Sequence, residues 1–307
     1  MRIFVTGASG WIGSAVVPEL IDSGHQVVGL ARSDASAAVL TAAGVEVVRG
    51  GVDDLDVLGS TAAASDGVIH LAFKHDIAFA GDYQGAAEAD RRAVDTFGDA
   101  LAGTERPFVL ASGVVGLAPG RVANERDMPT IDGSPASIRS ATAQAVLALA
   151  SRGVRSSVVR LSPTCHGEGD NGFMATLVAI ARARGVSGHI GDGANRWPAV
   201  HRLDAARLFR LAAEKAPAGS VLHGVAEEGV RTRDIAEVIG RHLDVPVTSV
   251  APEAAAEHFT WLGAFLGLDA PASSTLTREL LDWRPTHPGL LEDLGKGHYF
   301  HVPATPA

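Results

Sequence analysis

The chain has 307 residues, of which 46% are hydrophobic and 20% charged, and this composition is typical of a globular protein with a full core. The formal net charge is −9 and no basic block is present, which argues against nucleic acid and anionic membranes as partners. No apolar run approaches the ~20 residues that span a bilayer. An apolar run near the N-terminus leaves no room for a signal peptide, so we expect a cytoplasmic protein.

The cysteine and histidine content argues against a metal site. Cys165 is the single cysteine, which excludes an internal disulfide and a cysteine-built metal site. The 12 histidines are scattered and lack the HExxH spacing of a zinc enzyme. We therefore expect no metal and a small molecule as the substrate. The sequence leaves open whether the chain forms a homodimer.

The N-terminal stretch has the pattern strand, glycine turn, helix, strand. Residues 3–5 form a short, partly β-branched apolar run, as in a strand buried on both faces of a parallel sheet. Gly7 permits a tight turn, Gly10 lets the backbone approach a ligand, and Gly13 lets the next helix pack near the strand. The second strand covers residues 27–30. Because amides at a helix start attract a pyrophosphate, this stretch predicts dinucleotide binding.

The end of the second strand indicates which dinucleotide binds. An acidic residue there takes the ribose 2′-hydroxyl of NAD, but this sequence has Ala31-Arg32-Ser33. A guanidinium suits a 2′-phosphate, so Arg32 favours NADP as the cofactor. The alternative is that Arg32 is a solvated loop charge.

The GxxGxxG spacing of the three glycines is the form found in the extended short-chain dehydrogenases and reductases. The sequence resembles this family, with its NAD-dependent epimerases and dehydratases, over nearly its whole length. The resemblance implies an α/β fold: a Rossmann-type, doubly wound parallel sheet with a smaller, discontinuous C-terminal substrate lobe. The implied parts are an NADP-binding domain of residues 1–165 plus 200–226 and a substrate-binding lobe of residues 166–199 plus 227–307.

Hydrophobic patterning places the remaining elements of the large domain and part of the lobe. Strands are the short apolar runs, and helices are the longer stretches with helical spacing. We expect strands at residues 45–49, 68–73, 107–111, 156–160 and 221–225, and helices at residues 35–43, 83–102, 137–151, 173–184, 205–213 and 232–243.

The resemblance also implies the cofactor contacts. In the family an aspartate after the third strand contacts the adenine ring, and Asp53 matches it best, although Asp53 is also an ordinary helix-capping residue. The strand through His70 resembles the family's His-Leu-Ala strand, whose last residue lies against the cofactor; His70 itself is better interpreted as a core histidine. The expected cofactor contacts are Gly7, Ser9, Gly10, Trp11, Ile12, Gly13, Arg32, Ser33, Asp53, Leu71, Ala72 and Ser112.

Residues 110–116 resemble the family's SSxxVYG segment, whose Ser or Thr hydrogen-bonds the substrate oxygen. Ser112 matches that residue, although the segment is one residue shorter and has valine for the tyrosine; the alternative is a serine that caps its own turn. The family's YxxxK pair is missing, because its positions fall near Ala136 and Ser140. Arg139 is the only cation close to the lysine position. The usual tyrosine route for the proton is therefore closed.

Another group must then carry the proton. We rank the candidates His166, His75, Lys74 and a water held by Ser112, because a histidine titrates near neutrality. His166 follows the sixth strand in a segment that resembles the family's RPxxVYG, although it also fits a loop residue beside Gly167. Lys74 and His75 lie just past the carboxyl end of the fourth strand, where such sheets bind ligands.

The function that this pattern favours is an NADP(H)-dependent reductase that acts on a small carbonyl-like substrate by hydride transfer without the usual tyrosine. One alternative is a non-catalytic NADP-binding redox sensor that regulates a partner protein, which the missing pair favours. A sugar-nucleotide epimerase or dehydratase is the third reading, and it depends still more on the missing tyrosine.

Overall fold

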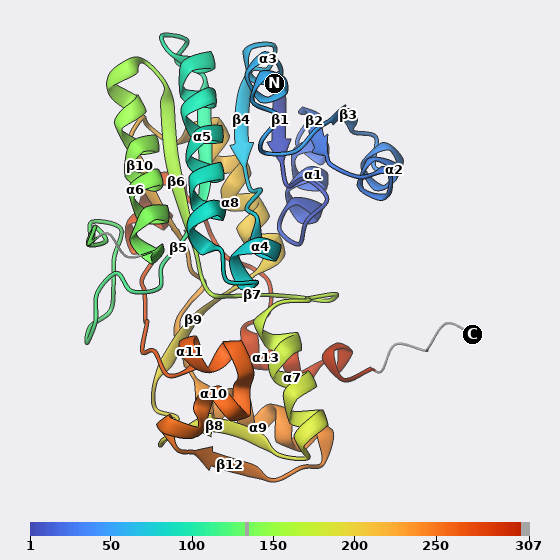
Figure 1. Cartoon of the computed structure of the whole chain (residues 1–307), viewed down its shortest axis with the longest axis vertical. Helices are drawn as coiled ribbons and strands as arrows, with labels where there is room; N and C mark the ends of the chain where they lie inside the picture. Colours follow the sequence, from blue (N-terminus) through green and yellow to red (C-terminus); the bar gives the residue numbers. More distant parts are fainter. Residues whose placement is uncertain (133–134, 302–307) are drawn as a thin grey trace.

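The computed structural model describes residues 1–132 and 135–301. Its large domain contains a seven-stranded parallel sheet in the order β10-β6-β5-β4-β1-β2-β3 (Figure 1). The strands are β1 (Arg2–Thr6), β2 (Gln26–Ala31), β3 (Glu46–Arg49), β4 (Gly67–His70), β5 (Pro107–Gly113), β6 (Arg155–Leu161) and β10 (Ser220–Gly224). This arrangement confirms the Rossmann-type fold class.

Alternation along the first strand explains why helices cover both faces of this sheet. Ile3 and Val5 belong to the core cluster under α1 and α8, and Phe4 belongs to the cluster under α3, α5 and α6. Each residue is fully buried. The covering helices are α1 (Gly13–Asp22), α3 (Leu55–Ala63), α5 (Tyr83–Leu101), α6 (Pro135–Ala148) and α8 (Arg202–Lys215), and α2 (Asp34–Ala42) lies beside the sheet edge.

A smaller lobe lies below this domain in Figure 1. It has a three-stranded sheet in the order β11-β9-β7 and a two-stranded sheet of β12 and β8, with a core cluster of its own around Met174 and Trp197. Its elements are β7 (Thr164–His166), α7 (Phe173–Arg184), β8 (Ser187–Ile190), β9 (Arg196–His201), β11 (Glu227–Arg231), α9 (Thr232–Leu243), β12 (Val247–Val250), α10 (Ala255–Phe259), α11 (Gly263–Leu266) and α13 (Leu290–Gly295).

One part of the C-terminal stretch packs back on the large domain. Leu281, at the end of α12 (Thr275–Leu281), and Trp283 belong to the same core cluster as Val5. The Trp283 indole donates to the Asp204 carbonyl over 3.0 Å, and the amide of Thr286 donates to the Asp204 carboxylate over 3.0 Å. These contacts join residues expected in the lobe to the larger domain.

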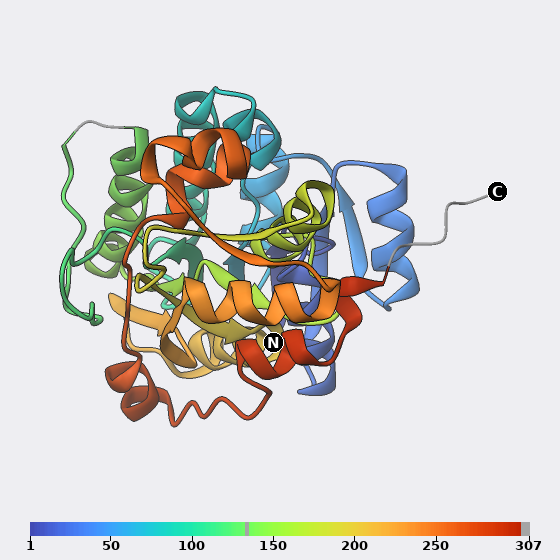
Figure 2. The same cartoon turned by 90° about the horizontal axis from the view of Figure 1, so that it is seen from below.

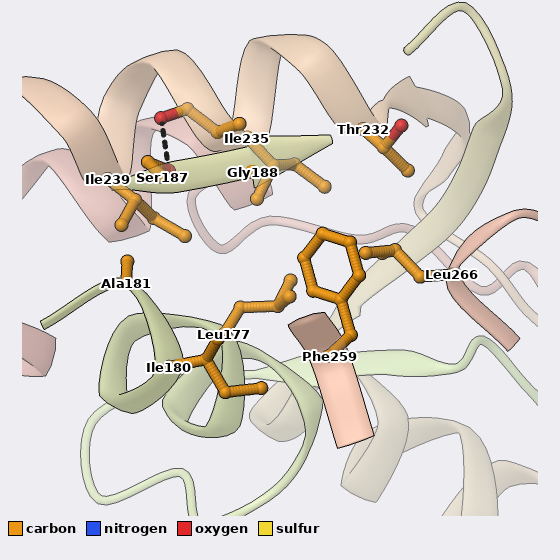
Figure 3. A pocket seen from close by; sticks show the side chains of 11 residues that line it. Leu177, Ile180, Ala181, Ser187, Gly188, Thr232, Ile235, Ile239, Phe259 and Leu266 are labelled. Atoms are coloured by element: carbon orange, nitrogen blue, oxygen red, sulfur yellow. Dashed lines mark hydrogen bonds between the residues drawn. The ribbon is translucent and has the colours of Figure 1, made fainter. Parts of the chain in front are cut away.

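The interior of the small lobe holds an apolar cavity between α7 and α9 (Figure 3). Leu177, Ile235 and Phe259 are among its lining side chains, and its volume of about 10 Å³ leaves room for about one water. Ser187, on the wall, gives its hydroxyl to the Ala236 carbonyl over 2.8 Å. This space is a packing gap and does not provide a substrate site. Among the described residues, no helix combines the length and apolar character needed to cross a membrane.

Candidate functional site

The glycine turn has the close backbone packing that the sequence predicts. Gly7 has a φ of +67°, and a Cβ on it would lie 2.8 Å from the Ala72 amide nitrogen. A Cβ on Gly13 would lie 2.1 Å from the Gly7 carbonyl oxygen, so only glycine lets α1 begin this close to β1. At Gly10 a Cβ would meet that oxygen at 3.2 Å. No side chain caps the start of α1. The turn therefore fits a pyrophosphate held by backbone amides.

A buried polar network supports this turn from below. His70 places Nδ1 at 2.6 Å from the Thr6 hydroxyl and Nε2 at 3.1 Å from an Asp90 carboxylate oxygen. The same hydroxyl accepts the Ala72 amide over 3.2 Å. His70 is therefore a hydrogen-bonded core histidine whose network holds the backbone against which Gly7 packs.

Trp11 connects the turn to the small lobe. Its indole nitrogen donates to the Cys165 carbonyl over 2.8 Å. The guanidinium of Arg202 lies 4.2 Å from the centre of the Trp11 ring. Because Cys165 belongs to β7 and Arg202 begins α8, this ring lies at the junction between the two sheets.

The end of β2 brings two arginines close together. Arg32 is 74% exposed and forms an ion pair with Asp76 over 3.1 Å. Arg49 lies beside it, because β3 pairs with β2 so that Arg49 is opposite Ala31. Arg49 donates to the Ser33 carbonyl over 2.5 Å. Sequence reasoning missed Arg49, whose position depends on the register of β3.

Ser33 itself caps a helix. Its hydroxyl accepts the Ser36 amide over 3.2 Å, and the Ser36 hydroxyl accepts the Ser33 amide over 3.1 Å. This reciprocal pair is a capping box at the start of α2. The backbone next to Arg32 is therefore fixed by helix capping.

Lys74 pairs with the aspartate predicted to contact adenine. Its ammonium donates to one Asp53 carboxylate oxygen, and Arg92 lies 3.4 Å from the other oxygen. The hydrogen bond from Lys74 holds the pKa of Asp53 below its usual value. Lys74 thus neighbours Asp53, and this placement favours a role in cofactor binding over proton transfer.

Ser112, Arg139 and His75 gather around the carboxyl ends of β4 and β5. Ser112 lies at the end of β5, and the Arg139 guanidinium reaches the Ala111 carbonyl at 3.5 Å. The same guanidinium lies 4.1 Å from the centre of the Phe73 ring. The centre of the His75 ring lies 4.9 Å from the centre of the Phe73 ring. His75 begins α4 (His75–Phe79), a short helix that the sequence did not predict.

The surroundings of His75 favour the neutral imidazole. Burial lowers the pKa of His75, and the positive charge of Arg139 lowers it further. The protonated ring that a proton donor needs is therefore populated mainly below neutral pH. The side chain of Ala136, at the tyrosine position, lies outside what the structure describes; Ser140, at the lysine position, is a half-buried residue of α6.

His166 lies inside the protein at the end of β7. It is fully buried, and its Nδ1 is 2.9 Å from a carboxylate oxygen of Asp293. Its ring lies 5.4 Å from that of His201, which stacks on His287 at 4.7 Å. Burial, then the neighbouring His166 and His287, lower the pKa of His201 to about 4. These contacts favour the structural alternative for His166 over the role of proton donor.

Known proteins resemble this chain in sequence and in fold. The model of the NAD dependent epimerase/dehydratase family matches residues 3–223. An uncharacterized protein of Schizosaccharomyces pombe is 48% identical over 304 residues, which cover 98% of this chain and 100% of that protein. An uncharacterized protein of Saccharomyces cerevisiae is 46% identical over 296 residues, which cover 96% and 98%.

Two solved structures extend the similarity of fold. The UDP-glucose 4-epimerase of Thermotoga maritima, with UDP-glucose, is 19% identical, covers 98% of both chains and has a TM-score of 0.76. The dTDP-glucose 4,6-dehydratase of Streptomyces venezuelae, a double mutant with NAD bound, is 21% identical, covers 97% of this chain and 96% of that one, and has a TM-score of 0.77. From the sequence matches and the shared fold together, the chain belongs to the NAD dependent epimerase/dehydratase family.

Proposed function

We propose that the protein is an NADP(H)-dependent oxidoreductase that reduces a small carbonyl-like substrate by hydride transfer without a catalytic tyrosine. Membership in the family supports an enzyme with a nicotinamide dinucleotide cofactor. The observation that carries the proposal is the glycine turn, since Gly7 packs on Ala72 and Gly13 packs on the Gly7 carbonyl. That packing leaves the start of α1 open to a pyrophosphate.

The choice of NADP rests on the two arginines at the ends of β2 and β3. Arg32 replaces the acidic residue that would bind a ribose 2′-hydroxyl, and Arg49 lies opposite the residue before it. Their guanidinium groups would hold a 2′-phosphate by charge-assisted hydrogen bonds. The present partners of Arg32 and Arg49 are Asp76 and Asp34, exposed carboxylates that a phosphate would displace. We call this part of the crevice the adenosine end.

At the opposite end, Ser112, His75 and Arg139 would act on the substrate oxygen. A bound nicotinamide supplies the hydride. The Ser112 hydroxyl donates a hydrogen bond to the carbonyl oxygen and orients it, and Arg139 stabilises the negative charge that develops there. His75 in its protonated form donates the proton. We call this group the reactive end, and it replaces the usual tyrosine and lysine.

His75 replaces His166 as our leading proton donor because of where the two rings lie. The His75 ring lies beside Phe73 and within the electrostatic reach of Arg139, at the strand ends. His166 is fully buried on Asp293, and Lys74 pairs with Asp53. A water held by Ser112 remains the second proposal for the proton.

The alternatives rest on single observations. The absence of tyrosine and lysine near Ala136 and Ser140 favours a non-catalytic NADP-binding redox sensor. The similarity to structures with bound UDP-glucose or NAD favours a sugar-nucleotide epimerase or dehydratase. We place the reductase first because the reactive end gathers a hydroxyl, an imidazole and a guanidinium.

Cofactor titration tests this proposal. Purified protein is titrated with NADPH and with NADH by calorimetry, and the titrations are repeated with Arg32→Ala. We expect NADPH to bind more tightly than NADH, and the variant to lose about tenfold in NADPH affinity while its NADH affinity stays unchanged. Equal affinities for the two cofactors in the wild type would refute the NADP assignment, and a lack of binding by either would refute the oxidoreductase.

A further inference from the structure

Four aromatic side chains form a connected group on the small lobe. The Phe173 ring is central: its centre lies 5.4 Å from that of Trp197, 5.5 Å from that of Trp261 and 6.3 Å from that of Phe265. Trp261 and Phe265 also contact each other at 6.3 Å. These spacings are those of interacting aromatic pairs. We call Phe173, Trp197, Trp261 and Phe265 the aromatic wall.

The wall lies on the side of the lobe that faces the large domain. Phe173 begins α7, directly after the loop in which Gly169 approaches Trp11 of the glycine turn. Figure 1 shows the first turn of α7 on the upper side of the smaller lobe. In Figure 2 the orange helices α10 and α11 are drawn next to the teal helices α4 and α5. The wall therefore begins at the end of α7 that follows the loop beside the glycine turn.

The segment that carries Trp261 and Phe265 is held in place by β9. The Trp197 indole donates to the Leu268 carbonyl over 3.1 Å, and the Asn195 amide donates to the Leu266 carbonyl over 2.7 Å. Arg196 adds an ion pair to Asp269 over 2.9 Å. Because these contacts fix the backbone at the C-terminal end of α11, the Phe265 ring presents a preorganised surface.

This surface is apolar and accessible. Trp261 is 41% exposed and Phe265 38% exposed, whereas Trp197 is buried at the base of the wall. The neighbouring cation is already occupied, since the hydrogen bond from Arg196 to Asp269 raises the pKa of Arg196 and fixes its guanidinium. A planar, uncharged ring needs aromatic faces, which the wall supplies. Clustered exposed rings of this kind mark a ligand site.

We infer that the substrate is an uncharged aromatic carbonyl compound whose ring packs on the aromatic wall. This inference rests on the proposed function and names its substrate class. In the reaction, the carbonyl carbon gains a hydride from NADPH and the C=O π electrons move to the oxygen, which then takes a proton. The aldehyde is reduced to the alcohol, and NADPH is oxidised to NADP⁺.

Calorimetric titration tests the inference with cinnamaldehyde as the aromatic probe and UDP-glucose as the sugar-nucleotide probe. Each is titrated into the protein with NADP⁺, where reduction cannot occur, and into the protein alone. We expect saturable binding of cinnamaldehyde, weakened about tenfold in Trp261→Ala and nearly restored in Trp261→Phe. Leu280→Ala, at an exposed apolar residue of α12, is the matched control and should bind like the wild type.

Binding of UDP-glucose without cinnamaldehyde would overturn the inference, and so would an unchanged cinnamaldehyde affinity in Trp261→Ala. If Trp261→Ala changes only the self-association of the protein, as sedimentation would show, the wall is an interface and the inference fails. A titration with NADP⁺ alone measures cofactor binding and so tests the proposed function separately from the aromatic wall. Loss of cofactor binding would refute that function, while cinnamaldehyde binding to the protein alone still reports on the wall.

Discussion

The adenosine end and the reactive end of the crevice are held by different forces. At the adenosine end, Arg32 pairs with Asp76, and Lys74 pairs with Asp53, through charged and largely exposed side chains. At the reactive end, Arg139 and His75 pack against the Phe73 ring. Exposed ion pairs contribute about 0–1 kcal/mol each and weaken with salt. The reactive end responds instead through the pKa of His75, which its surroundings lower.

Because of this contrast, cofactor affinity and the rate of the chemical step should respond to different experimental conditions. Cofactor affinity should depend on ionic strength, because its determinants are exposed charges that a phosphate rearranges. The rate of the chemical step should depend on pH, because burial and Arg139 shift the pKa of His75. Of the predictions below, His75→Phe alters the reactive end and Asp76→Asn alters the adenosine end. The other two, His166→Phe and Gly10→Val, alter positions outside these two ends.

The largest effect is expected from His75→Phe. General acid catalysis contributes about 10²- to 10⁴-fold to a rate, so kcat should fall by about that factor while the NADPH Kd stays unchanged. The pKa of His75 lies below 6.5, and reduction needs the protonated ring, so wild-type kcat should fall as pH rises through that lowered pKa. The variant should lack this decline. A variant with wild-type kcat at every pH would assign the proton to the water held by Ser112.

His166→Phe should act on stability and leave the chemistry intact. The variant removes the imidazole that lies 2.9 Å from the buried Asp293 carboxylate and leaves His298 at 3.7 Å from it. Breaking a buried pair costs about 3–5 kcal/mol, so we expect a loss of up to about that size. Urea denaturation should show the loss, with His301→Phe at an exposed position as the control. If the variant is stable but its kcat falls as much as that of His75→Phe, His166 is the proton donor.

Gly10→Val should weaken cofactor binding while the protein stays folded. A Cβ at this position meets the Gly7 carbonyl oxygen at 3.2 Å, and a branched side chain extends into the space where the backbone must approach the pyrophosphate. Overpacking of about 1–3 kcal/mol corresponds to roughly 5- to 150-fold in Kd. Gly295→Val is the control, since a Cβ there meets nothing within 4 Å. Unchanged NADPH affinity in Gly10→Val would show that the pyrophosphate does not bind at the glycine turn.

Asp76→Asn should produce the smallest change, in the opposite direction. The Asp76 carboxylate competes with a 2′-phosphate for Arg32, so its removal should tighten NADPH binding by up to about fivefold. NADH affinity should not change, and the gain should shrink as salt rises. Asp282→Asn, which removes another exposed partner of an arginine, serves as the control. A weaker NADPH affinity in Asp76→Asn would show that Asp76 itself helps to hold the cofactor.

The fold could be predicted from the sequence because its signals are local. The glycine turn lies between two apolar runs, and the alternation of Ile3, Phe4 and Val5 already requires cover on both faces of the sheet. The strand and helix ranges of the large domain follow from similar patterns. The helix α4 was missed because it has only five residues and follows a strand that ends at His70, earlier than expected.

The contacts of the candidate site could not be predicted in the same way. His166 meets Asp293 across 127 residues of sequence, and Lys74 meets Asp53 across 21. Such partners depend on how strands register and helices pack, which single-residue chemistry does not reveal. Arg49 illustrates the point, since only the pairing of β3 with β2 places it beside Arg32. The residue types could therefore suggest candidate site residues, but they could not show which candidates lie together in the site.

Hydride transfer itself provides the most direct test of the central claim. NADPH in which deuterium replaces both hydrogens at C4 of the nicotinamide is incubated with the protein and cinnamaldehyde, and the alcohol is analysed by mass spectrometry. The account predicts one deuterium in the alcohol, formed at the wild-type rate also by Tyr83→Phe, whose ring lies near Phe73 at 5.9 Å. Bound NADPH that transfers no deuterium to this or any other carbonyl compound would contradict the account and indicate a non-catalytic sensor.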